Sequence, residues 1–98
     1  MSEERIMTLN PVPEKAGTNI DRAKYELIRE SIINSIQESG VLTFKQLQKE
    51  VHKDLDGRFE GSISWYVTTV KLDLEARGII ERVPSSSPQQ LRIKYLPS

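Results

Sequence analysis

The sequence predicts a small, mainly α-helical domain with a small antiparallel β-hairpin near its C-terminus. Four apolar residues recur at helical spacing and would face a core from one side of a helix. Gly78 follows where a left-handed residue commonly ends a helix, and residues 79–83, three of which are β-branched, suit a strand. Residues 84–88 are turn-forming, and residues 91–96 alternate as a returning strand does. The four helical residues are Ile63, Val67, Val70 and Leu74.

The chain is expected to begin with an N-terminal arm at residues 1–18, followed by one domain at residues 19–98. The arm contains Pro11, Pro13 and Gly17 and has little apolar periodicity, so we expect it to be extended rather than a folded element. It also carries apolar residues. Packing of the arm against the domain or against a second copy therefore remains an open alternative.

A first helix is predicted from an N-cap at Thr18 or Asn19 to about Ser39, with Gly40 as the stop. A second row of residues lies partly off its core stripe, and we favour ordinary burial over contact with the arm or with a dimer partner. The core stripe is Ile20, Leu27, Ile28, Ile32 and Ile36, and the second row is Tyr25, Arg29 and Ile33.

A short strand is predicted at residues 41–43, directly before a second helix. Thr43 and Gln46 fit a capping box, in which each side chain satisfies a free backbone donor. The helix should reach about Asp54 and end near Gly57, because its apolar residues keep helical spacing up to that point. These apolar residues are Phe44, Leu47, Val51 and Leu55.

The order of helix, short strand, helix, turn, helix and hairpin resembles the winged helix-turn-helix fold over residues 19–96. Residues 67–82, which include Leu74, Glu75 and Gly78, are similar to the end of a recognition helix and the first wing strand. The chain also resembles short, uncharacterised bacterial winged-helix proteins. The resemblance implies a non-catalytic transcriptional regulator that binds double-stranded DNA, with the third helix in the major groove and the wing on the backbone. It also implies pairing as a homodimer.

The same resemblance places the DNA-contacting residues on the third helix and on the wing. Hydroxyl groups, a threonine methyl group and a lysine can each contact phosphates or base edges. However, residues 62–75 contain no Arg, Asn or Gln, the common bidentate readers of bases. The alternative is therefore a module for protein–protein interaction or dimerisation that uses Trp65 and Leu72. The predicted DNA-contacting residues are Ser62, Ser64, Trp65, Thr68, Thr69 and Lys71 on the helix, and Arg92 and Lys94 on the wing.

The charge and the composition of the chain limit which classes of function we expect. The net charge is zero, and residues 44–98 hold nine basic and seven acidic residues, so non-specific DNA affinity should be modest. The chain has no cysteine and a single histidine, His52, and it contains no nucleophile or phosphate-loop motif, so we expect no metal, no cofactor and no enzyme activity. No apolar run is long enough to predict a membrane span or a secretory signal, and this favours a location in the cytoplasm.

A third hypothesis for the function is a specificity module of a restriction or repair assembly whose catalytic part lies on another chain.

Overall fold

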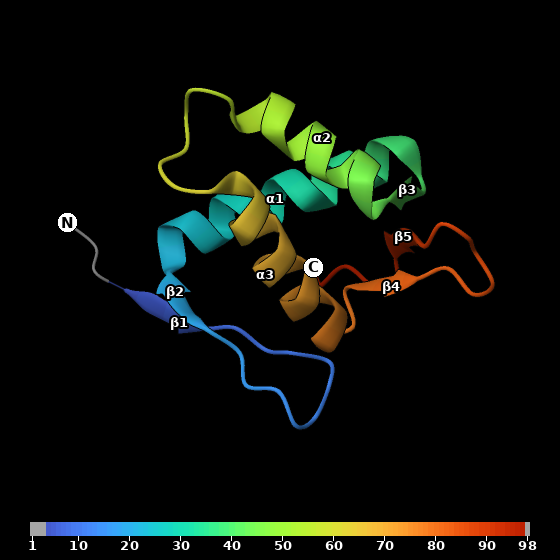
Figure 1. The fold of residues 1–98 in the computed structure, drawn as a ribbon, viewed down its shortest axis with the longest axis horizontal. Helices are drawn as coiled ribbons and strands as arrows, with labels where there is room; N and C mark the ends of the chain where they lie inside the picture. The colour runs from blue at the N-terminus through green and yellow to red at the C-terminus, as the bar shows by residue number, and fades with distance from the viewer. Residues whose placement is uncertain (1–3, 98) are drawn as a thin grey trace.

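The computed structural model describes residues 4–97 of the 98-residue chain. These residues form three helices and two small antiparallel sheets (Figure 1). None of the helices in this part of the chain is both long enough and apolar enough to cross a membrane. The elements in chain order are β1 (Arg5–Met7), β2 (Asn19–Asp21), α1 (Arg22–Ser39), β3 (Leu42–Thr43), α2 (Phe44–Leu55), α3 (Ile63–Ala76), β4 (Ile80–Arg82) and β5 (Gln90–Ile93).

Each helix begins at a side chain that accepts a hydrogen bond from an otherwise free backbone N–H group. Thr43 and Gln46 form the predicted capping box at the start of α2. Ser62 accepts from the N–H of Trp65 at 3.2 Å at the start of α3. The predicted start of α1 was wrong, because Asp21 is its N-cap and residues 19–21 are extended in β2.

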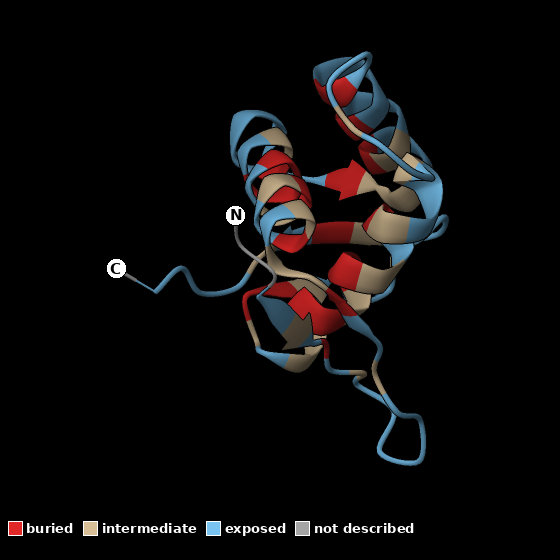
Figure 2. Cartoon of the chain, turned by 90° about the vertical axis from the view of Figure 1, so that its left-hand side faces the viewer, coloured by how far each residue is buried: buried red, intermediate tan, exposed pale blue. Residues whose placement is uncertain are grey.

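The apolar stripes of the three helices meet in one core, which the strands close from one side. Figure 2 shows the buried residues on the sides of the helices that face each other and on the strands. Tyr25 and Ile33 are also buried, at 4% and 8% exposure, so ordinary burial of this second row is confirmed for these two residues. The largest fully buried side chains include Ile28, Ile32 and Ile36 from α1, Leu47, Val51 and Leu55 from α2, Val67, Val70 and Leu74 from α3, and Ile80 and Leu91 from the strands.

The three-stranded sheet has the order β3-β5-β4, with both pairs antiparallel. The predicted short strand is therefore present, and it pairs with the second strand of the hairpin through Leu42 and Leu91. Gly78 has a φ of 75°, which is the left-handed conformation expected at this reversal. β5 ends at Ile93, and Tyr95 beyond it is 65% exposed, so the returning strand is shorter than predicted.

The N-terminal segment folds onto the domain as a hairpin. β1 pairs with β2 so that Ile6 lies opposite Ile20, and the N–H of Thr8 donates to the carbonyl of Thr18 at 2.9 Å. The two sides of this hairpin approach each other closely at Gly17, where a Cβ atom would lie 1.6 Å from the carbonyl oxygen of Thr8. The expectation of an extended arm rather than a folded element was wrong for its described residues, since strand pairing between distant residues leaves no local periodicity. The open alternative of packing on the domain is confirmed.

Candidate functional site

The outward side of α3 presents small polar side chains and one tryptophan. Most of the residues predicted on this helix are exposed, whereas Thr69 is half-buried. Helical periodicity alone was enough to place them, because they lie opposite the stripe of α3 that enters the core. The exposed residues are Ser62, Ser64, Trp65 and Thr68.

Helix α2 contributes polar side chains to the same surface. The side-chain amide of Gln48 donates to the carbonyl of Ser64 at 3.2 Å and lies 3.5 Å from Oγ1 of Thr68. Nε2 of His52 lies 3.2 Å from Oγ of Ser64, and Nδ1 of His52 is 2.7 Å from the carbonyl of Gln48. The α3 hydroxyl groups are thus held in place by α2, which reading α3 alone could not reveal.

Two lysines on α2 add positive charge beside these hydroxyl groups. Lys45 is three residues before Gln48 and four before Lys49, and Lys49 is three residues before His52. Residues at this spacing lie on one side of a helix. Both lysines are exposed, and neither has an ion pair within residues 4–97. We call this surface the α2–α3 face and define it as Lys45, Gln48, Lys49, His52, Ser64, Trp65 and Thr68.

Lys71 does not belong to the α2–α3 face, and the prediction that it is exposed was wrong. It is only 8% exposed, its Nζ atom is 2.7 Å from Oε1 of Glu75, and it lies 5.4 Å from the centroid of the Phe44 ring. The reason is its register: Lys71 is four residues after Val67 and three before Leu74, so its aliphatic stem borders the core stripe.

The β4–β5 hairpin carries less free charge than was predicted for a wing. Arg92 pairs with Glu81 at 2.7 Å, because these residues are direct cross-strand partners in β5 and β4. Arg82 pairs with Glu75 at 2.9 Å. Lys94 is exposed and has no ion pair in the described part of the chain, so it is the predicted wing residue that keeps a free cation.

Trp65 projects from an aromatic cluster at the start of α3. It is 46% exposed, and its ring meets the ring of Tyr66 edge to face, with 4.9 Å between centroids. Tyr66 in turn meets Phe59 at 5.1 Å, and the ammonium group of Lys24 lies 5.6 Å from the Tyr66 centroid. The Trp65 ring therefore packs on the Tyr66 ring while much of its surface is open to solvent.

A buried polar cluster lies on the side of α3 that points away from Ser64 and Thr68. Asp73 is fully buried, and its carboxylate accepts hydrogen bonds from the hydroxyl of Tyr25, from the backbone N–H of Leu9 at 2.8 Å and from Nε of Arg77 at 2.9 Å. Burial, and then the hydrogen bond to Asp73, raise the pKa of Tyr25 to about 12. The hydrogen bond to Asp73 also raises the pKa of Arg77.

Sequence reasoning did not find this cluster. The Asp73–Arg77 pair has the i,i+4 spacing of a helical ion pair and could have been noticed. Tyr25 and Leu9 are 48 and 64 residues away from Asp73, and no local signal links them to it. For metals, residues 4–97 contain no group of three or more His, Cys, Asp or Glu side chains that could hold an ion.

These elements define a small α/β domain whose described residues form three helices and two small antiparallel sheets. The chain belongs to DUF6958, a family of unknown function, whose model matches residues 5–91. The match starts in β1 and ends in β5, so the N-terminal hairpin belongs to the family unit together with the helices. No curated protein matches the chain.

Proposed function

We propose that this protein is a winged helix-turn-helix protein that binds double-stranded DNA in transcriptional regulation, without catalysis. In this proposal α3 enters the major groove and the β4–β5 hairpin contacts the backbone. The element order from α1 to β5 and the sheet order β3-β5-β4 support it.

The observation that carries the proposal is the α2–α3 face. Exposed Lys45 and Lys49 lie beside the hydroxyl groups of Ser64 and Thr68, which Gln48 and His52 hold in place. Cations on α2 would contact phosphates, and hydroxyl groups held on α3 would meet phosphates or base edges with little loss of rotamer freedom.

The charge pairing sets the expected strength of binding. Lys71 and Arg92 are engaged within the chain, so Lys45, Lys49 and Lys94 remain as free cations near the proposed interface. Neutralising about three phosphates should make the logarithm of the binding constant fall with the logarithm of salt concentration with a slope of about −3. We therefore propose weak, salt-sensitive binding in which α3 supplies little base discrimination.

The test is fluorescence anisotropy with a labelled duplex of random sequence at low and at physiological salt. Lys49→Glu should weaken binding about tenfold or more at low salt, because it replaces a phosphate-contacting cation by an anion. Lys15→Glu is the matched control: Lys15 is exposed in the N-terminal hairpin loop and the charge change is the same. Equal affinities for the two variants, or no salt-sensitive binding by the wild type, would refute the proposal.

A second candidate function is protein–protein interaction or dimerisation through the exposed side of α3. The exposure of Trp65 on an aromatic support favours it, since tryptophan is enriched among residues that dominate interface energies. Sedimentation analysis separates the two functions: Trp65→Ala should abolish self-association of the wild type, whereas Lys49→Glu should leave it intact. A wild-type chain that is monomeric at all concentrations would count against a homodimer.

A further inference from the structure

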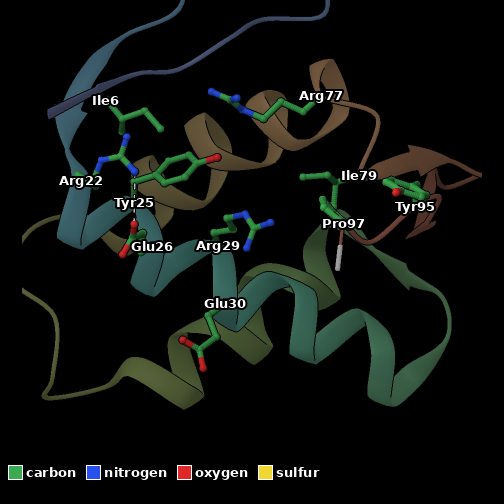
Figure 3. Close-up of a pocket in the computed structure, with 10 residues that line it drawn as sticks. All are labelled: Ile6, Arg22, Tyr25, Glu26, Arg29, Glu30, Arg77, Ile79, Tyr95 and Pro97. Carbon is green, nitrogen blue, oxygen red and sulfur yellow. Dashed lines mark hydrogen bonds and ion pairs between the residues drawn. The ribbon is translucent and has the colours of Figure 1, made fainter.

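An open hollow of about 920 Å³ lies between the N-terminal hairpin, α1, the C-terminal end of α3 and the tail after β5 (Figure 3). This volume is within the range of small-molecule sites in proteins. Its lining combines three arginines with an apolar wall. The arginines are Arg22, Arg29 and Arg77, and the wall includes Ile6, Ile79 and Tyr95.

The three arginines differ in how far they are already satisfied. Arg77 is bound to Asp73, and Arg22 forms a long ion pair of 3.5 Å with Glu26 and has a buried Nε atom without a hydrogen-bond partner. Arg29 is half-buried and has no hydrogen bond or ion pair within the described residues. Figure 3 shows its guanidinium group directed towards Ile79 and Pro97, across the hollow. Arg29 is thus a donor that lacks an acceptor within the described residues.

The charges of the lining residues indicate which class of ligand the hollow favours. The lining holds three guanidinium groups, of which Arg77 is paired with Asp73 and Arg22 with Glu26, so Arg29 is the one cation of the described lining without a carboxylate partner. Figure 3 shows the carboxylate of Glu30 pointing away from the arginines. A guanidinium group binds a planar carboxylate in a bidentate manner, and the apolar wall would cover an apolar body. This combination matches a monoanion better than a phosphate dianion.

The hollow and the hydroxyl groups of Ser64 and Thr68 in the α2–α3 face lie on different sides of α3. Asp73, which holds Arg77 at the hollow, is nine residues after Ser64 and five after Thr68, so it is rotated roughly 180° and 140° from them. The inference therefore does not depend on the proposed DNA binding.

We propose that this hollow binds a small organic monocarboxylate with an aromatic or aliphatic body, with Arg29 as the principal partner of the carboxylate. Benzoate is a suitable probe, and two-dimensional NMR of the labelled full chain is a suitable readout. Benzoate should shift the backbone amide signals of Arg29 and Ile79 saturably, with a Kd on the order of millimolar for so small a ligand. Benzamide, which has the same shape without the charge, should bind about tenfold or more weakly.

Arg29→Gln tests the assigned partner. Because Arg29 has no partner in the described structure, this variant should keep the thermal midpoint of the wild type and lose the preference for benzoate over benzamide. Lys15→Gln removes an exposed cation that is not among the lining residues and should retain the preference. Four results would overturn the proposal: no saturable shift with benzoate, equal binding of benzoate and benzamide, unchanged benzoate binding by Arg29→Gln, or inorganic phosphate binding as tightly as benzoate.

Discussion

The hydroxyl group of Tyr25 donates a hydrogen bond to the carboxylate of Asp73 in the interior of the domain, which ties α1 to α3. The same carboxylate accepts the backbone N–H of Leu9 and the guanidinium group of Arg77. One buried charge therefore connects the N-terminal hairpin, the first helix and the third helix. Three donors, one of which is the cation Arg77, compensate for the cost of its burial.

Replacing Asp73 with Asn should destabilise the domain by about 3 kcal/mol, because the variant loses the charge and leaves at least one of its buried donors without an acceptor. Urea unfolding of the two proteins measures this difference. Glu81→Gln is the control, since it breaks a more exposed ion pair with Arg92 and should cost no more than about 1 kcal/mol. Equal losses for the two variants would contradict the central role of Asp73.

Stability should fall at alkaline pH because of Tyr25. Its pKa is raised from 10.0 to about 12 in the folded protein, so folding favours the protonated hydroxyl group. The resulting stabilisation, on the order of 2 to 3 kcal/mol, is complete below pH 10 and is lost as the pH rises through 12. Urea unfolding at a series of pH values should show this decline in the wild type. In Tyr25→Phe the decline should be smaller, and an identical decline would exclude Tyr25 as its source.

Gly17→Ala should destabilise the hairpin by about 3 kcal/mol, because the added Cβ would lie 1.6 Å from the carbonyl oxygen of Thr8 and must displace the backbone. Gly57→Ala provides the comparison. Gly57 has a φ of 75° and nothing within 4 Å of the added atom, so only backbone strain of about 1 kcal/mol is expected there. Thermal or urea unfolding tests the order of the two effects. A smaller loss for Gly17→Ala than for Gly57→Ala would mean that the hairpin does not pack as described.

Lys71→Met should act on stability and not on DNA binding. The change removes a nearly buried cation from Glu75 and should cost about 1 to 3 kcal/mol in urea unfolding. Because Lys71 is engaged by Glu75, the salt dependence of duplex binding should stay that of the wild type. For Lys45→Gln we expect a salt slope shallower by about 1. A shallower salt slope for Lys71→Met than for the wild type would mean that Lys71 contacts DNA.

The sequence by itself determined the positions of α2, α3 and the C-terminal hairpin, because capping residues, apolar periodicity and turn residues are local signals. It also placed Ser62, Ser64, Trp65 and Thr68 on the outside of α3. Only the tertiary structure decided which charges are free and how the N-terminal segment folds. Groups from other elements determine the contact of Lys71 with Phe44, the Glu81–Arg92 pair and the bonds of Asp73 to Tyr25 and Leu9. Tyr25 and Leu9 are separated from Asp73 by 48 and 64 positions in the sequence. Hydrogen bonds over such separations leave no periodic pattern in the chain, so packing alone determines them.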